Sequence, residues 1–417
     1  MNSYQSAIKK LIKNNFKIKN EIVQIKKSLN RITAFDIISP VNYPASDNTA
    51  FDGYAINSKE TNLLSSKKSK KFKIIKTLAA GDNPNIKKIP KFSTIEVMTG
   101  AIIQKPFDTI IPIEQIHFFP NKSSPKYIIL KKKININEYI RPAGSDFKKG
   151  NKVIKKGQLI NPSHILALKT LGIEKILVKK KPNIIFYPTG NELSESKKIP
   201  NWKIRNSNSI YLYSFIKNLP INFKEKKILR DKDINSFKNE IKKNIKLNSD
   251  LVITSGAVSA GKFDFIPNVI KQFKLKSFFK GVAIRPGKPL MFAKFKNNMC
   301  FFGLPGNPIS SVVCFRFFVL PLLFKSLEIN LEKPIIAKLK NNFSKKKNFT
   351  RFIKGKITFS KKGEIEFEIF KGQESYKMRS FTKSNAWGVF KDGISNFKKG
   401  SNIECFSSSG FNELLMG

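Results

Sequence analysis

The sequence contains very little cysteine and histidine. Its three cysteines are Cys300, Cys314 and Cys405, and its two histidines are His117 and His164. Three scattered cysteines cannot form a disulfide framework, and the chain has no Cys-x-x-Cys pair or His/Cys cluster with the spacing of a zinc site. A Ser-His-Asp or Cys-His mechanism would depend on one histidine. The composition therefore argues against thiol, zinc and triad chemistry, and it favours a reducing compartment, which we expect to be the cytoplasm.

Carboxylates are also scarce: 29 Asp and Glu stand against 78 Lys and Arg, which gives a formal net charge of +49. Such a charge can indicate nucleic-acid or membrane binding, but only eight of the basic residues are Arg, the residue that dedicated nucleic-acid readers favour. We interpret the excess as a drift of the whole chain toward Lys, Asn, Ile and Phe, with a functional polyanion surface as the alternative. We expect no specific nucleic-acid partner. Three lysine-rich stretches are interpreted as solvated linkers or turns: residues 65–71, 179–181 and 344–347.

The chain lacks a long uninterrupted apolar run. The most apolar stretch, residues 309–324, is shorter than the roughly 20 residues that span a bilayer and contains Arg316 and Pro321. The basic N-terminal segment, residues 1–20, has no apolar core of the kind found in a signal peptide. We therefore predict a buried helix at 309–324 and no membrane partner.

The hydrophobic pattern predicts a multidomain protein of mixed α/β and β class. Helical spacing predicts two helices within residues 1–37. Residues 1–48 and 141–180 together make up a predicted region of N-terminal helices and extended linking segments. Short alternating runs predict a small β domain at 49–140. Strands that alternate with helices predict a parallel α/β domain at 181–330, and short strands then predict a C-terminal β-barrel or sandwich at 331–417.

Three loops rich in small residues follow apolar strands of the predicted α/β domain. They are Pro188–Glu192, Thr254–Gly261 and Gly303–Pro308. An open parallel sheet binds ligands at the carboxyl ends of its strands, where backbone N–H groups can receive an anion. None of the loops is a P-loop or a GxGxxG dinucleotide motif, so neither a kinase nor a dehydrogenase is favoured. We expect the three loops to meet at one edge of the sheet, although each alone could be a tight turn.

A few charged residues stand out against the lysine background. Arg285 and Lys288 lie in an Ile-Arg-Pro-Gly-Lys-Pro segment whose proline and glycine fix the backbone, and they are placed for contact with a phosphate or oxyanion. Four acids lie in loops close to glycine, where they could bind Mg²⁺ or, in the simpler interpretation, form Asx turns and caps. These acids are Asp52, Asp146, Glu192 and Asp264.

Six motifs, in order and in spacing from about residue 38 to 325, resemble the MoeA/gephyrin E-domain family of molybdopterin molybdenumtransferases. They are Asp47–Ala55, Met98–Ala101, Thr189–Leu193, Thr254–Gly261, Pro286–Pro289 and Leu304–Pro308. The resemblance is weaker after residue 325, where Arg351 and residues 373–385 still look like the family's C-terminal barrel. It implies a central MogA-like parallel α/β domain, a small β domain, an extended linking domain and a C-terminal β-barrel.

The resemblance also implies an activity. Family members take adenylylated molybdopterin and molybdate as substrates, use Mg²⁺, and release AMP as molybdenum is inserted to give the molybdenum cofactor. They are homodimers whose active site joins two subunits, and a molybdopterin adenylyltransferase and acceptor molybdoenzymes are further possible partners. The alternatives are a catalytically weakened scaffold or cofactor-binding protein of the same fold and, from charge alone, a nucleic-acid-binding protein.

Carried onto this sequence, the resemblance assigns three sets of site residues. The catalytic set is Asp52, Thr99, Asp146, Glu192, Arg285 and Lys288. The cofactor-binding set is Thr189, Gly190, Thr254, Ser255, Gly256, Ser259, Gly261, Pro305, Gly306, Asn307, Arg351 and Ser380. The metal ligands are Glu192 and Asp264. The chain departs from the family pattern at Asn191, where an Asp is usual, at Ala257 (Gly), at Lys262 (an acid) and at Arg285 (Lys). These departures concern the metal site more than the fold.

Overall fold

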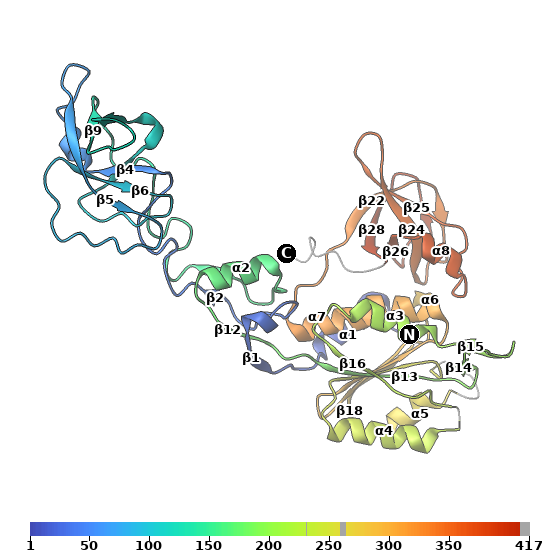
Figure 1. Ribbon diagram of the computed structural model, residues 1–417. Coiled ribbons are helices and arrows are strands. Elements are labelled where there is room, and N and C mark those ends of the chain that lie inside the picture. Colours follow the sequence, from blue (N-terminus) through green and yellow to red (C-terminus); the bar gives the residue numbers. More distant parts are fainter. Residues whose placement is uncertain (231, 259–263, 409–417) are drawn as a thin grey trace. The chain divides into compact units, whose positions relative to one another are not determined.

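The computed structural model describes residues 1–230, 232–258 and 264–408. The chain divides into two compact units. The first unit comprises Met1–Phe35, Lys156–Asn161 and Ile176–Gly417, and the second unit comprises Asp36–Lys155 and Pro162–Lys175. Figure 1 labels many of their helices and strands.

The second unit is built on a six-stranded sheet with the order β7-β4-β6-β5-β9-β8. Its strands are β4 (Gly53–Ile56), β5 (Lys70–Leu78), β6 (Ser93–Val97), β7 (Thr109–Pro112), β8 (His117–Phe119) and β9 (Tyr127–Leu130). Alternate residues of β4 enter two different cores, because Tyr54 and Ile56 pack into one cluster and Ala55 into the other. The sheet is therefore covered on both faces, and it forms the small β domain that the alternating pattern predicts.

Short paired segments complete the second unit. β2 (Ile37–Ile38) pairs with β11 (Lys152–Ile154), and β3 (Asn48–Thr49) pairs with β10 (Ile140–Arg141). The helix α2 (Pro162–Thr170) lies where the helical spacing predicts one. Two 3-10 turns, η2 (Ser58–Thr61) and η3 (Ile113–Gln115), connect the strands of the sheet.

The N-terminal segment differs from the prediction of two helices. The first helix, α1 (Tyr4–Lys13), begins at Ser3, whose hydroxyl accepts a hydrogen bond from the Ser6 N–H (3.2 Å). The second predicted helix is wrong: residues Asn20–Gln24 form β1, which pairs with β12 (Lys175–Lys179), and only Ile25–Lys27 makes a 3-10 turn, η1. Pairing with a strand distant in sequence overrides the local helical spacing.

The centre of the first unit is a six-stranded sheet with the order β16-β13-β17-β21-β20-β18. Its strands are β13 (Asn183–Pro188), β16 (Asn222–Glu225), β17 (Leu251–Ser255), β18 (Leu275–Lys280), β20 (Met291–Phe295) and β21 (Cys300–Leu304). The prediction of a parallel sheet holds for the four strands β16, β13, β17 and β21. β20 pairs antiparallel with both of its neighbours, β21 and β18. The sheet is therefore mixed at one side.

Helices cover both faces of this sheet (Figure 1). One face packs against α1 and α3 (Ser207–Ile216), and the other against α4 (Ile234–Lys246) and α5 (Ile266–Lys271). A long apolar helix joins the first group: α6 (Pro308–Cys314), a π-helical turn (Phe315–Val319) and α7 (Leu320–Leu327). It is long and apolar enough to cross a membrane, but 89% of that stretch is buried in the protein. The predicted buried helix is confirmed, whereas the expectation that it is too short to span a bilayer is wrong, because the helix extends over Pro308–Leu327.

The C-terminal strands close into a five-stranded barrel, β24-β25-β22-β28-β26, because β26 pairs back onto β24. The strands are β22 (Ile335–Leu339), β24 (Thr350–Phe359), β25 (Ile365–Ile369), β26 (Ala386–Phe390) and β28 (Asn402–Ser407). The short elements β23 (Phe343–Ser344), β27 (Asn396–Phe397) and α8 (Met378–Lys383) complete it. Phe367 fills the centre against Gly355 and Gly388, where an added Cβ would lie 2.4 and 2.5 Å from its ring. The predicted C-terminal barrel is confirmed.

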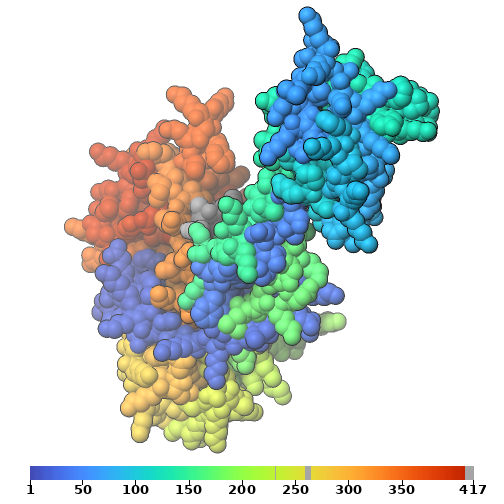
Figure 2. Space-filling view, turned by 90° about the vertical axis from the view of Figure 1, so that its left-hand side faces the viewer, coloured from blue at the N-terminus to red at the C-terminus, as the bar shows by residue number. Residues whose placement is uncertain are grey.

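The barrel contacts the rest of the first unit at several places. Tyr4 of α1 packs edge-on against Phe318 and against Phe352 of the barrel. The strand β19 (Ile284–Arg285) pairs with β24. Arg316, only 4% exposed, donates from Nε to the carbonyl of Ser407 (3.2 Å) and pairs through Nη2 with Glu332. In Figure 2 the N-terminal residues (dark blue) lie directly below the barrel (orange to red).

Two of the lysine-rich stretches contain buried lysines, which corrects their interpretation as solvated linkers. Lys179 ends β12, and its Nζ lies 2.6 Å from a carboxylate oxygen of Glu328. Lys345 is 8% exposed and donates to the carbonyl of Phe349 (2.8 Å). In the third stretch, Lys70 and Lys71 begin β5. Lys179 therefore belongs to a strand and pairs with an acid far away in the sequence, whereas the partner of Lys345 lies only four residues away.

We predict that Glu332→Gln lowers the free energy of unfolding by about 3–5 kcal/mol, because it leaves the buried guanidinium of Arg316 without its counter-charge. Glu174→Gln, at the exposed Lys169–Glu174 pair, should change it by less than about 1 kcal/mol. Urea denaturation followed by circular dichroism measures both. Equal effects of the two substitutions would show that Arg316 does not anchor the barrel.

Candidate functional site

The three small-residue loops lie side by side at one edge of the α/β sheet. The parallel register aligns Pro188 with Ser255, and Ser255 with Leu304, so β13, β17 and β21 end at the same level. The loops are joined by hydrogen bonds: the Thr189 N–H donates to Ser255 O (3.0 Å) and the Gly256 N–H to Leu304 O (2.9 Å). The expectation from the sequence that the loops meet is confirmed.

Close approach of the backbones explains the glycines of this edge. Gly256 has φ of +104°, and a Cβ there would lie 2.5 Å from the carbonyl oxygen of Thr189. Ala257 adopts φ of +53°, a left-handed conformation that glycine adopts more easily. The departure from the family pattern at Ala257 therefore keeps a glycine-like backbone. Ser259, Gly261 and Lys262 lie outside the described residues.

Glu192 follows β13 in an exposed loop that leads into the short strand β14 (Leu193–Ser194), paired with β15 (Ile204–Arg205). Its carboxylate folds back over Gly190, where an added Cβ would lie only 2.4 Å from Oε2. Asp264 precedes α5, on the segment that follows β17. Both predicted metal ligands thus lie on segments that leave neighbouring strands at the carboxyl edge.

Two arginines meet where the α/β layer adjoins the barrel. β19 and β24 run parallel with Arg285 opposite Arg351. Burial and the neighbouring Arg285 lower the pKa of Arg351, against the raising effect of Glu374. The Nε atom of Arg351 is buried and has no hydrogen-bond partner among the described residues. Two adjacent cations with an unused donor favour an anion beside them.

Lys288 and Ser380, two further predicted site residues, differ in their exposure. Lys288 is exposed and follows Gly287, which has φ of +106° and packs against Cys314. Ser380 is 9% exposed and donates its hydroxyl to the carbonyl of Gly372 (2.6 Å). It also lines a cavity of about 490 Å³ in the barrel, whose cationic side chains are Lys371, Lys377, Arg379 and Lys383.

The carboxyl edge of the sheet reaches this barrel segment through Asn307. Its Nδ2 donates to the hydroxyl of Ser375 (3.2 Å), next to the segment that carries Ser380. Reasoning from the sequence missed Asn208, which donates to the carbonyl of Gly306 (3.1 Å), and Lys354, which is 1% exposed and donates to Lys377 O (2.9 Å). Lys354 could not be told apart from the many surface lysines, although its place in an alternating strand is a weak signal.

In the second unit, Asp52 and Thr99 come together. Oδ1 of Asp52 accepts hydrogen bonds from the backbone N–H (2.6 Å) and the hydroxyl (2.8 Å) of Thr99. These two bonds lower the pKa of Asp52, so its carboxylate stays ionised. Gly53 is required beside it, because a Cβ there would lie 2.1 Å from the carbonyl oxygen of Ile111.

Asp146 lies on a different turn of the second unit. Its N–H donates to the carbonyl of Tyr43 (3.1 Å), and the preceding Gly144 N–H donates to Pro44 O (2.9 Å). The side chain of Asp146 is exposed. The structure therefore brings two of the three predicted catalytic residues of this unit into contact and places the third on a neighbouring segment of the chain.

The donors present suit Mg²⁺ held partly by a substrate. The described residues contain no group of three or more His, Cys, Asp or Glu side chains that could hold a metal alone. Mg²⁺ is commonly held by one or two carboxylates together with substrate phosphates and waters. Glu192 and Asp264 fit that pattern as hard oxygen donors beside an anion-binding edge.

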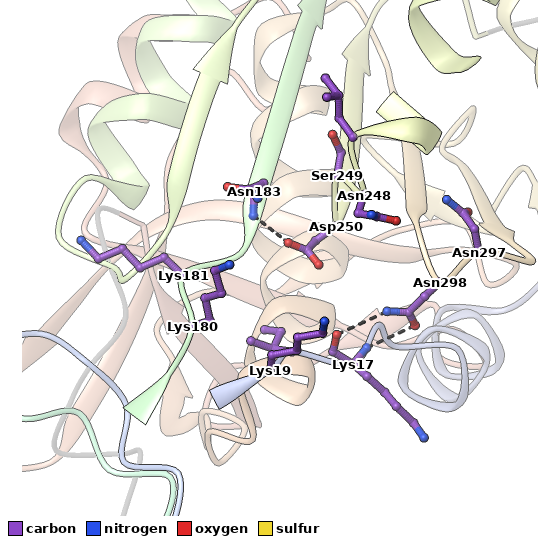
Figure 3. Close-up of a pocket in the computed structure, with 12 residues that line it drawn as sticks. Lys17, Lys19, Lys180, Lys181, Asn183, Asn248, Ser249, Asp250, Asn297 and Asn298 are labelled. Carbon is purple, nitrogen blue, oxygen red and sulfur yellow. Dashed lines mark hydrogen bonds between the residues drawn. The ribbon is translucent and has the colours of Figure 1, made fainter. Parts of the chain in front are cut away.

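A second cleft, of about 480 Å³, lies at the opposite, amino edge of the sheet. Figure 3 shows Asp250 in it, with its Oδ2 accepting a hydrogen bond from the Asn183 N–H (2.8 Å). Lys19 and Lys180 are on its wall, and burial raises the pKa of Asp250. Ligands of open α/β sheets bind at the carboxyl ends of the strands, so this cleft is not the candidate active site.

The first unit combines an open α/β sheet, with small-residue loops at the carboxyl ends of its strands, and a closed β-barrel, and ligands of such sheets bind at the strand ends. Three family models match this chain: the MoeA N-terminal region (domain I and II) at residues 2–172, a probable molybdopterin binding domain at 186–325, and the MoeA C-terminal region (domain IV) at 336–406. Together they cover both units.

Individual relatives match over the whole length. A molybdopterin molybdenumtransferase of Staphylococcus epidermidis is 31% identical, over 99% of this chain and 98% of the relative. One of Staphylococcus aureus is 30% identical, over 99% and 97%. The crystal structure of a molybdopterin biosynthesis MoeA protein from Pyrococcus horikoshii superposes with a TM-score of 0.82 at 26% identity, covering 98% of this chain and 99% of that one. The chain belongs to the MoeA family of molybdopterin molybdenumtransferases.

We predict that Thr99→Val raises the pKa of Asp52 toward its ordinary value, because the substitution removes the hydroxyl hydrogen bond and leaves the backbone one. Thr99→Ser should keep the low pKa. A carboxyl-carbon NMR titration of Asp52 measures the change. Identical titration midpoints in the wild type and Thr99→Val would show that the hydroxyl does not stabilise the carboxylate.

Proposed function

We propose that this chain inserts molybdenum from molybdate into adenylylated molybdopterin and releases AMP in the same reaction. The observation that carries the proposal is the placement of the arginine pair, Arg285 and Arg351, beside the barrel segment that Asn307 ties to the carboxyl edge of the sheet. One region accepts a phosphate through backbone N–H groups, and the other accepts an oxyanion through guanidinium groups. Membership of the family supplies the identity of the two anions.

The carboxyl edge would hold the adenylylated substrate. The N–H groups of Thr189, Gly190 and Gly256 are hydrogen-bonded within the protein, so other N–H groups of the loops after β13, β17 and β21 would bind the phosphate, which the small residues let approach. Glu192 and Asp264 would hold Mg²⁺, which neutralises phosphate charge when it is bound. Cleavage of the adenylate then depends on positioning and charge neutralisation, so a site without histidine or cysteine is sufficient.

The arginine pair would hold molybdate. Arg285 is exposed and lies opposite the part-buried Arg351, whose buried Nε has no hydrogen-bond partner among the described residues. Guanidinium groups match oxyanions by paired hydrogen bonds, whereas the exposed ammonium of Lys288 contributes a mobile charge. Substitution of the family's usual Lys by Arg285 keeps the charge and adds donors for this task.

The second unit would complete the site of a partner subunit. Asp52, fixed by Thr99, and Asp146 supply carboxylates that we assign to the site of the other subunit of a homodimer. An ionised Asp52 is suited to orient a proton or a metal-bound water at the reacting phosphate. This arrangement makes dimerisation a condition for activity.

The test of the proposed function is AMP release from adenylylated molybdopterin by the purified protein. We expect release that requires both molybdate and Mg²⁺. Glu192→Gln should slow it by roughly 100-fold with an unchanged melting temperature, since one charge-positioning group is lost. Glu195→Gln, an exposed acid on the same loop arm, is the matched control and should have no effect. Loss of stability in parallel with activity would identify Glu192 as a turn residue.

The homodimer is tested by complementation. Asp52→Asn and Glu192→Gln should each be slowed by roughly 100-fold alone, but subunit exchange between them should restore roughly one quarter of the wild-type activity. This follows because half of the dimers are then mixed and each has one intact site. No recovery on mixing, or a fully active monomer in sedimentation analysis, would contradict a site shared between subunits.

A further inference from the structure

The side chain of Arg230 contacts the backbone of the loop that carries Glu192. Its Nη1 lies within hydrogen-bond distance of three carbonyl oxygens of that loop: Gly190 O (2.9 Å), Asn191 O (3.2 Å) and Leu193 O (2.8 Å). One guanidinium nitrogen thus lies among three carbonyl dipoles that turn toward it, on both sides of Glu192. Reasoning from the sequence did not single out this residue.

Arg230 is itself held in place by the backbone next to it. The Leu229 N–H donates to Pro188 O (2.9 Å), and the Gly190 N–H donates to Leu229 O (3.0 Å), so this segment runs beside the end of β13. The N–H of Arg230 also donates to Oδ2 of Asp233 (2.8 Å). These hydrogen bonds hold the backbone of Arg230 next to the loop that its side chain contacts.

Arg230 is one of several groups that hold the loop. Gly190 has φ of +138°, a conformation that glycine adopts more easily than other residues, so this residue alone does not fix the shape of the loop. Within the loop, the Leu193 N–H reaches Gly190 O only at 3.4 Å. Lys203 adds a second cation at Asn191 O, and the Ile204 N–H donates to Glu192 O (2.8 Å). Without Arg230, the part-buried contacts at the carbonyl groups of Gly190 and Leu193 would be lost, and the exposed Asn191 carbonyl would keep Lys203.

This arrangement gives the backbone carbonyl groups of the loop a different partner from the Glu192 carboxylate. Because the carbonyl oxygens of Gly190, Asn191 and Leu193 face a protein cation, they are occupied by Arg230 and do not compete for a bound metal. The Glu192 carboxylate folds over Gly190 instead. The carboxylate is then the oxygen donor that the loop offers to a ligand.

We propose that Arg230 is a positioning residue that holds the Gly190–Leu193 loop in the shape in which Glu192 binds the divalent cation of the nucleotide complex. The inference rests on the proposed function for its ligand, adenylate with Mg²⁺. Arg230 acts through Glu192 and has no contact of its own with the reacting atoms.

The test compares Arg230→Met with Arg205→Met. Arg205 is a matched control because it also donates to two carbonyl groups of the same loop arm, Ser196 O (3.2 Å) and Lys197 O (2.9 Å), away from Glu192. We expect Arg230→Met to raise the Mg²⁺ concentration for half-maximal AMP release by about tenfold or more, the usual effect of losing a residue that orients a metal ligand. Arg205→Met should leave it unchanged.

A second readout does not depend on turnover. Mn²⁺ binding in the presence of AMP, followed by electron paramagnetic resonance, should weaken by a similar factor in Arg230→Met, and added guanidinium should restore part of it. Unchanged Mn²⁺ and Mg²⁺ dependence in Arg230→Met would overturn the inference, as would a fall in melting temperature and activity at an unchanged Mg²⁺ requirement. If the wild type releases no AMP, the proposed function fails, and the Mn²⁺ comparison alone decides the role of Arg230.

Discussion

The site depends on one constraint, the in-register parallel pairing of β13, β17 and β21. This pairing ends the three strands together at Pro188, Ser255 and Leu304 and so brings three loops into mutual contact. The hydrogen bonds between the loops and the positive φ of Gly256 follow from that alignment. A shift of one strand by a residue would move its loop away from the others and turn its buried side chains to the opposite face.

Buried cations of this protein differ in whether the fold supplies their partners. Arg316 and Lys179 pair with the carboxylates of Glu332 and Glu328, and three lysines, Lys294, Lys345 and Lys354, donate to carbonyl groups. Arg351 is part-buried beside Arg285 and keeps an Nε without a partner among the described residues. The net charge of +49 therefore does not indicate where the site lies, whereas the surroundings of Arg351 do indicate it.

The sequence predicts local features well and distant pairings poorly. Apolar strands followed by small-residue loops, and the apolar stretch around Arg316, were sufficient to predict the α/β layer and its buried helix. The strand β1 was predicted as a helix because its partner, β12, lies some 150 residues further along the chain. The role of Arg230 could not be predicted for the same reason, because its three carbonyl acceptors lie in a loop that only the fold brings into contact with it.

The central claim is that a phosphate-accepting edge and an oxyanion-binding arginine pair serve one reaction. Its most direct test is the stoichiometry of the products, with AMP measured by chromatography and molybdenum bound to the pterin product measured by mass spectrometry after one incubation with molybdate and Mg²⁺. The account predicts equimolar AMP and inserted molybdenum, and the loss of both in Arg351→Ala. AMP released without molybdenum insertion, or tight binding of the substrate with neither product, would contradict it, and the second outcome would instead indicate a binding protein of the same fold.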